Sequence, residues 1–279
     1  MKNFKKLLAV LLAGLMLLSL AACGGKDDNV VKVGVLEADE IGMGKMATEE
    51  HRAHMKVDRN TPDDVTVKFV HYNNLSSALM DLESGNIMDL VVEDSVANYI
   101  AARNDKVAVT TGEITSYFSM MTMDSNKEVY DILNNAIKDM KADGTLDALI
   151  ENELKAYIEN DPEAKDLPHF DGAKTIKIGV TGDMPPMDFV ASNGKAAGFN
   201  IALLTEIANQ AQVNIELVQI ESGARAMALS SGKVDAVFWT RNSVCEVCGA
   251  EGAEKVDGTL VTESYYSDYT ASIKLKSDK

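Results

Sequence analysis

Two stretches of similar pattern recur in this chain: SSALMDLESGNIMDLVV at residues 76–92 and RAMALSSGKVDAVF at residues 225–238. Each begins with apolar residues at helical spacing, reaches a Ser-Gly pair and ends in a short apolar run. Glycine just past the last helical turn is a common helix end, because glycine adopts positive φ without steric cost. Each stretch therefore predicts a helix followed by a buried strand, and the pair predicts two similar α/β lobes.

Strands and helices alternate along the remainder of the chain, which favours a mostly parallel sheet in each lobe. Two-lobed α/β proteins tend to bind small ligands in the cleft between the lobes. Expected strands lie at 31–36, 65–70, 90–92, 107–109, 117–123, 175–180, 213–220, 234–239 and 269–275, and expected helices at 42–56, 74–82, 95–102, 129–140, 146–157, 199–210 and 225–230.

The N-terminus has the features of a secretory leader. A basic head, MKNFKK, precedes an apolar run at residues 7–20 that is too short to span a bilayer comfortably. The following Leu20-Ala21-Ala22-Cys23 resembles a bacterial lipobox, which implies that residues 1–22 are a lipoprotein signal peptide and that Cys23 carries diacylglycerol and palmitate. The alternative is an ordinary secretory signal with a chance cysteine. Residues 23–30 are interpreted as a flexible polar tether.

The composition is acidic, with 43 Asp and Glu against 27 Lys and Arg and a net charge of −16. Such a surface repels nucleic acid and anionic lipid headgroups, so we expect no nucleic-acid partner. Attachment to the membrane would then depend on the lipid anchor rather than on a basic patch.

Four motifs stand in the C-terminal half: IKIGVTGDMPPM at 176–187, NGKAAGFNI at 193–201, SGKVDA at 231–236 and TESYYSD at 262–268. Together they resemble the extracytoplasmic solute-binding proteins of amino-acid ABC transporters, family 3. The family's lobe 1 comes first in the chain, lobe 2 is inserted after it, and closing helices return to lobe 1.

Here the order is rotated. Residues 31–116 resemble lobe 2, residues 117–158 resemble the return strand and closing helices of lobe 1, residues 159–173 form a linker, and residues 174–279 resemble lobe 1. The resemblance implies an α/β, two-lobed, periplasmic-binding-protein-like fold of type II that is circularly permuted. Permutation is tolerated where termini are exposed and close together. It would place residues 31–36 and 269–275 on opposite sides of one hinge. The competing account is two tandem truncated copies that pair between chains.

A free amino acid presents a carboxylate and an ammonium, so its site needs an arginine fork or helix amides together with an acid. Arg241 follows the strand at 234–239, at the end where α/β sheets bind ligands. The resemblance also places Arg225 where some acidic-amino-acid binders carry an arginine. Each arginine has the alternative of a surface salt bridge. The family's usual "T.eR" arginine has no counterpart near Ser243.

On the opposing lobe, the resemblance aligns Glu93 or Asp94 with the acid that meets the ligand ammonium, and this choice stays open. Trp239, the sole tryptophan, could stack on the ligand or pack in the core. Thr240 and Asp183 complete the expected ligand-binding set. Met184 or Met187 replaces the family's stacking aromatic.

Cys245 and Cys248 form a CxxC, which outside the cell is most simply a disulfide. A zinc site would need two further ligands, for which His51 and His54 are candidates. We expect no metal and no cofactor.

Taken together, the sequence and the family resemblance predict a non-enzymatic, monomeric, lipid-anchored solute-binding protein of an ABC importer. It would act on the extracytoplasmic face of the cell membrane, deliver an amino acid or related small polar solute, and partner with permease and ATPase subunits. The alternatives are a fold-related enzyme, of the cyclohexadienyl dehydratase or wall-lytic kind, and a metal-binding or sensory protein.

Replacing Cys23 tests the anchor. Cys23→Ser should release the protein to the medium or leave the precursor unprocessed, because serine cannot form the thioether. Fractionation of cells into membrane and medium measures this. Membrane partition and processing equal to those of the unaltered protein would contradict the lipobox interpretation.

Overall fold

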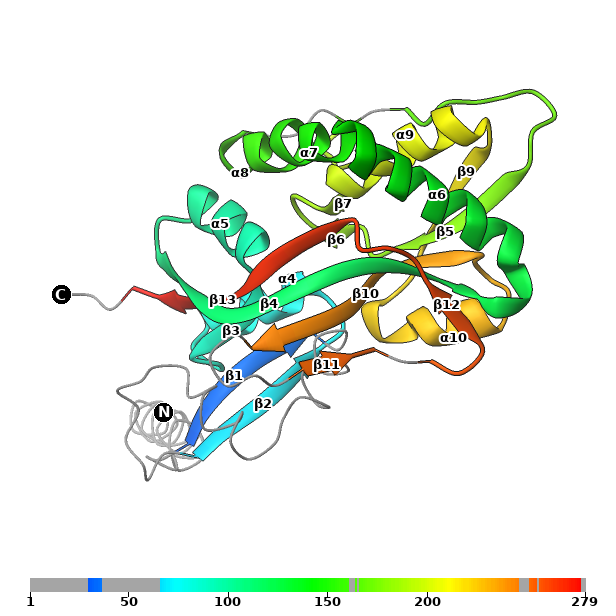
Figure 1. Cartoon of the computed structure of the whole chain (residues 1–279). Coiled ribbons are helices and arrows are strands. Elements are labelled where there is room, and N and C mark those ends of the chain that lie inside the picture. The colour runs from blue at the N-terminus through cyan, green and yellow to red at the C-terminus, as the bar shows by residue number, and fades with distance from the viewer. Residues whose placement is uncertain are drawn as a thin grey trace, which may run out of the picture.

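The computed structural model describes residues 30–36, 66–160, 164, 166–245, 251–254 and 256–276. The fold is mixed α/β with two lobes that share one ten-stranded sheet (Figure 1). The sheet runs in the order β2-β1-β3-β13-β4-β10-β5-β9, with β11 paired to β10 and β12 paired to β4.

The N-terminal lobe contains three parallel strands, in which β1 lies between β2 and β3. Asn74 caps the helix that joins β2 to β3, its Oδ1 accepting from the Ser77 amide at 2.9 Å. The elements are β1 (Val30–Leu36), β2 (Thr66–Tyr72), α4 (Leu75–Glu83), β3 (Asp89–Glu93) and α5 (Asp94–Arg103).

The C-terminal lobe repeats the arrangement, with β5 between β9 and β10 and all three parallel where they pair. A small antiparallel sheet, β6-β7-β8, follows β5. The elements are β5 (Thr175–Val180), β6 (Asp183–Met184), β7 (Asp188–Val190), β8 (Ala196–Ala197), α9 (Phe199–Ala211), β9 (Asn214–Gln219), η3 (Ser222–Ala224), α10 (Arg225–Ser230), β10 (Ala236–Cys245), β11 (Glu251–Ala253) and β12 (Thr259–Val261).

Two long strands, β4 (Val107–Met123) and β13 (Tyr266–Leu275), cross between the lobes (Figure 1). β4 pairs with β13 along its first part and with β10 and β12 along its last part. The sequence predicted two separate strands here, at 107–109 and 117–123. The two are one strand, because ladder pairing to β13 continues through Thr110 and Thr111.

The chain then returns to the C-terminal lobe through helices. α6 (Lys127–Asp143) and α7 (Thr145–Ile150) contact α9, whereas α8 (Ala156–Glu159) contacts α5 of the N-terminal lobe. A π-helical turn, η2 (Glu151–Lys155), interrupts the helix predicted at 146–157. The predicted helix at 42–56 lies outside the described residues.

The expected placement of residues 31–36 and 269–275 on opposite sides of a hinge is wrong. β13 pairs antiparallel with β3, and β3 pairs parallel with β1, so β1 and β13 lie in one sheet with β3 between them. β1 begins at the same end of this sheet at which β13 finishes.

None of the helices in the described ranges combines the length and apolar character needed to cross a membrane.

Gly198 and Gly194 test the packing around the start of α9. Both have positive φ, at 109° and 79°. A Cβ at Gly198 would meet the carbonyl oxygens of Met187 and, at 2.6 Å, Pro186, whereas a Cβ at Gly194 would meet nothing within 4 Å.

Gly194→Ala should therefore lower the free energy of unfolding by about 1 kcal/mol, the cost of positive φ alone. Gly198→Ala should lower it by about 3 kcal/mol, because overpacking adds to that cost. Urea denaturation of both variants measures the difference. Equal losses would show that the backbone contact at Gly198 is not tight.

Candidate ligand-binding cleft

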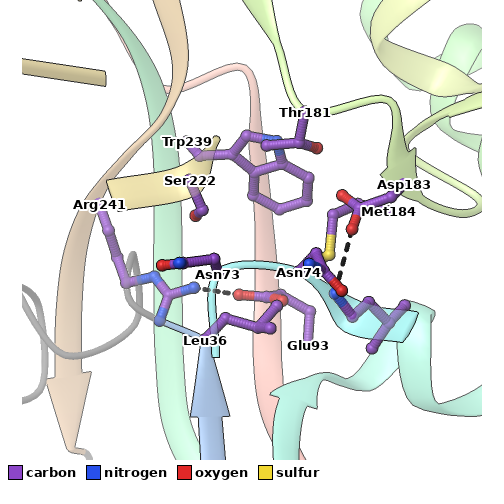
Figure 2. A pocket seen from close by; sticks show the side chains of 11 residues that line it. Leu36, Asn73, Asn74, Glu93, Thr181, Asp183, Met184, Ser222, Trp239 and Arg241 are labelled. Atoms are coloured by element: carbon purple, nitrogen blue, oxygen red, sulfur yellow. Dashed lines mark hydrogen bonds and ion pairs between the residues drawn. The ribbon is translucent and has the colours of Figure 1, made fainter. Parts of the chain in front are cut away.

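A small cavity lies between the two lobes, at the carboxyl ends of their parallel strands, where open α/β sheets bind ligands. It leaves only about 20 Å³ for solvent, which is room for one water molecule, so the lobes are closed on each other. Figure 2 shows the lining side chains converging from both lobes. The N-terminal lobe contributes Leu36, Asn73, Asn74, Leu75 and Glu93, and the C-terminal lobe contributes Thr181, Asp183, Met184, Ser222, Trp239 and Arg241.

An ion pair spans the cavity. Arg241 Nη2, from β10, contacts Glu93 Oε1, from the end of β3 (Figure 2). The two side chains are 4% and 3% exposed, so both charges are removed from water. The guanidinium also lies 5.1 Å from the centre of the Phe118 ring, which supplies a cation–π contact. The two groups predicted to face each other across a ligand thus meet directly.

A second contact across the cavity joins Asp183 to helix α4. Asp183 Oδ2 accepts from the Leu75 amide at 3.0 Å, at the helix N-terminus, where unpaired amides favour a negative charge. Burial raises the pKa of the Asp183 carboxyl, and the nearby Asp188 carboxylate adds to the rise, while the Leu75 amide opposes it.

Asp188 organises the wall contributed by the C-terminal lobe. It is 1% exposed and its Oδ1 accepts from Thr181 N at 3.0 Å, Thr181 Oγ1 at 2.7 Å and Gly182 N at 2.8 Å. Its Oδ2 accepts from Asn200 Nδ2 and from Trp239 Nε1, both at 2.9 Å. One carboxylate therefore fixes the loop after β5, the start of α9 and the indole of Trp239.

Trp239 has φ of 66°, at a break in the register between β10 and β4. Such a β-bulge redirects side chains, and bulges are common beside functional sites. The indole meets the Phe118 ring edge-on, with centroids 5.3 Å apart. Trp239 and Arg241, two residues apart on β10, both line the cavity.

Four of the seven predicted ligand-binding residues line the cavity: Arg241, Trp239, Asp183 and Glu93. Thr240 is buried but does not line it. Asp94 lies outside it and accepts hydrogen bonds from Asn98 and Thr111, so Glu93 is the acid of the pair that faces the cavity.

Arg225 also lies outside the cavity wall. It is 3% exposed and its guanidinium is paired with Glu254, at 3.2 Å and 3.3 Å. The Arg225 guanidinium therefore contacts its own lobe rather than the cavity.

Several residues that line the cavity were not predicted from the sequence, among them Asn73, Asn74 and Ser222. Asn74 carried a usable signal, because it is the N-cap residue of a helix that follows a strand. Ser222 had none, because the short η3 turn that positions it has no clear sequence pattern.

Cys245 is the last residue of β10. Cys248, Cys23, His51 and His54 lie outside the described residues, so the disulfide, lipid and zinc interpretations remain predictions from sequence.

Part of the chain is similar in sequence to a known binding protein. The ABC transporter arginine-binding protein 1 of Escherichia coli (strain K12) is 29% identical over 126 residues, which is 43% of this chain. The match spans 49% of that relative, about half of its length.

Two solved structures show a weaker likeness. The ligand-binding component of an ABC-type import system from Staphylococcus aureus, solved with zinc bound, is 12% identical, with 87% of this chain and 65% of that chain covered and a TM-score of 0.42. The periplasmic aliphatic sulphonate-binding protein of Escherichia coli is 11% identical, with 89% and 62% covered and a TM-score of 0.39. At these TM-scores neither likeness carries an argument about function or lobe order.

Residues 176–242 match the sequence model of the bacterial extracellular solute-binding proteins, family 3. This segment contains β5, the small sheet, α9, β9, α10 and most of β10, and therefore every cavity residue of the C-terminal lobe. The family resemblance that the motifs at 176–187, 193–201 and 231–236 indicated is thereby confirmed over this segment.

Proposed function

We propose that this protein is the extracytoplasmic solute-binding component of an ABC importer and that it binds a zwitterionic amino acid between its lobes. The observation that carries the proposal is the Arg241–Glu93 pair, which places one cation and one anion on opposite walls of the same closed cavity. An amino acid presents the complementary pair of charges on one carbon atom.

The ligand would replace the direct ion pair with two ion pairs. Its carboxylate would take the place of the Glu93 carboxylate on Arg241, and its ammonium would take the place of the guanidinium beside Glu93. A ligand with only one of these charges would leave a buried protein charge without a partner, which is costly. Zwitterions are therefore favoured over simple acids and amines.

Binding requires the lobes to open, because about 20 Å³ cannot hold an amino acid. The crossing strands β4 and β13 connect the lobes and are the segments that would bend, as in other two-lobed proteins that close around a ligand.

The remaining residues that line the cavity would contact the side chain of the ligand and determine which side chains are accepted. Asp183 adds a carboxylate, and Asn73 and Ser222 add neutral polar groups, beside apolar surface from Met184 and Trp239. An acidic side chain would be repelled by Asp183, whereas a basic or hydrogen-bond-donating side chain would be accepted. The arginine named for the curated relative fits this preference.

The proposal includes three features from the sequence: anchoring of a monomer through Cys23, delivery to permease and ATPase subunits, and circularly permuted lobes. The strand order supports the permutation, because β13 leaves the C-terminal lobe and enters the sheet of the N-terminal lobe beside β3.

A fold-related enzyme is a second candidate, favoured by one observation. A cleft carboxyl with a raised pKa, as at Asp183, suits acid–base chemistry.

A screen of amino acids tests the function. A ligand that binds only the folded protein raises its melting temperature, and the sole tryptophan, Trp239, reports on the cavity by its fluorescence. We expect a saturable response to a neutral or basic amino acid and none to the corresponding amine or deaminated acid. Turnover of the bound compound would support the enzyme instead.

Arg241→Ala should weaken binding of the amino acid found in the screen by roughly thirty-fold to several thousand-fold, because removing one partner of a buried charge pair costs about 2–5 kcal/mol. Arg241→Lys should also bind poorly, since an ammonium cannot reproduce the planar fork. Calorimetry measures both affinities. Lys141→Ala, at an exposed pair with Glu263, is the control and should bind normally. A loss under about threefold for Arg241→Ala would contradict the assignment.

Asp183→Asn tests the buried carboxyl. Because the folded-state pKa is raised, the ionised group destabilises the folded protein at neutral pH, and this effect fades as the pH falls toward the usual carboxyl pKa near 4. The asparagine oxygen can still accept from the Leu75 amide. The variant should therefore be more stable than the unaltered protein at pH 7, and the difference should shrink with acidification. Urea denaturation at several pH values measures it, and a difference independent of pH would refute the argument.

A further inference from the structure

Arg225 is buried, yet its guanidinium makes contacts in three directions. Its Nε donates to the Ser222 carbonyl at 3.1 Å, its Nη1 donates to the Phe238 carbonyl at 2.9 Å, and its Nη2 lies 3.2 Å and 3.3 Å from the two oxygens of Glu254. Both side chains of this ion pair are almost fully removed from solvent, at 4% and 3% exposed.

The two carbonyls that Arg225 binds belong to segments that build the cavity. Ser222 lines the cavity itself. The Phe238 carbonyl belongs to the peptide that enters Trp239, the residue with φ of 66°. A positive φ is unfavourable for a bulky side chain and persists only where surrounding contacts determine it.

Glu254 completes the connection to Arg241. Its carboxylate holds Arg225, and its backbone amide donates to the Arg241 carbonyl at 2.9 Å. Glu254, which directly follows β11, therefore connects the side chain of Arg225 to the backbone of Arg241.

We infer that the Arg225–Glu254 pair is a clamp that positions Trp239 and Arg241 for the ligand without touching the ligand. Arg225 and Glu254 are positioning residues, which act through the backbone of Ser222, Phe238 and Arg241. The pairing also withdraws a cation from the cavity, so the pocket does not offer Arg225 to an acidic side chain. The inference about affinity rests on the proposed function, whereas the inference about Trp239 does not.

The test compares Arg225→Met and Glu254→Gln, which keep side-chain size and remove the charge pair. Three readouts are taken on the full chain: the emission and acrylamide quenching of Trp239, the melting temperature, and the calorimetric affinity for the amino acid found in the screen. Ile137→Val is the control, because Ile137 is a fully buried residue of α6 that does not line the cavity.

Both charge variants should shift Trp239 emission, increase its quenching and weaken binding about tenfold. Because the two residues act as a unit, the double variant should lose less affinity than the product of the single losses. The control should lower the melting temperature while leaving emission and affinity unchanged. If Arg225→Met does not fold, Arg225→Lys replaces it, since lysine keeps the charge but cannot bind in three directions.

Two results would overturn the clamp. If the variants lower the melting temperature but leave both Trp239 emission and affinity unchanged, the pair is only structural. If Glu254→Gln strengthens binding of an acidic amino acid, Arg225 is released to contact the ligand directly. Should no amino acid bind, the proposed function fails, and the emission and quenching of Trp239 still decide whether the clamp sets its position.

Discussion

Both lobes depend on the backbone pairing of β4. Its seventeen residues pair with β13 at one end and with β10 and β12 at the other, so one strand completes the ladder in each lobe. Buried amides and carbonyls must be paired, and neither lobe could satisfy its edge here without this strand. Phe118, fully buried where the two halves of β4 meet, contacts the indole of Trp239 and the guanidinium of Arg241. The element that joins the lobes therefore also supports the cleft.

Polar contacts join the two lobes across the cavity, and a ligand bound as proposed would have to replace them. Arg241 contacts Glu93, and Asp183 accepts from the Leu75 amide, so the protein satisfies its own buried charges across the lobes. The free energy of binding would then be the difference between the contacts that the ligand makes and the contacts that it displaces. Many ligand contacts alone would therefore not ensure tight binding. Under the proposed function the same balance would give selectivity, because only a ligand that replaces both members of the Arg241–Glu93 pair avoids leaving one of them buried alone.

The sequence predicted much of the fold because its signals are local. The helix stops at Gly85 and Gly232 and the periodic helices and strands around them correspond to observed elements. Arg241 was predicted from its place just after the expected strand at 234–239, although β10 extends to Cys245. Glu93 or Asp94 was implied by the family resemblance, and Glu93 is the one that lines the cavity. Trp239 lines the cavity and Thr240 does not, as alternation along a strand would give. The positive φ of Trp239 could not be predicted, because the run AVFWTR has the pattern of a regular strand. Arg225 was predicted as a ligand contact from the family resemblance, and its partner Glu254, 29 residues away in sequence, gave no local signal. The joining of 107–109 and 117–123 into one strand likewise depends on pairing with β13, which only the tertiary fold supplies.

The helices α4 and α10, which belong to the two segments of similar sequence, differ in the contacts that their first residues make. α4 brings the Leu75 amide to the cavity, where it binds Asp183 of the other lobe. α10 instead begins with Arg225, whose donors bind carbonyls of its own lobe and the Glu254 carboxylate. One helix start thus makes its contact across the interface, while the contacts of the other stay within its own lobe. Under the proposed function both kinds would be needed: one wall would keep Trp239 and Arg241 in place, and the contacts of the opposing wall would be exchanged for those of the ligand.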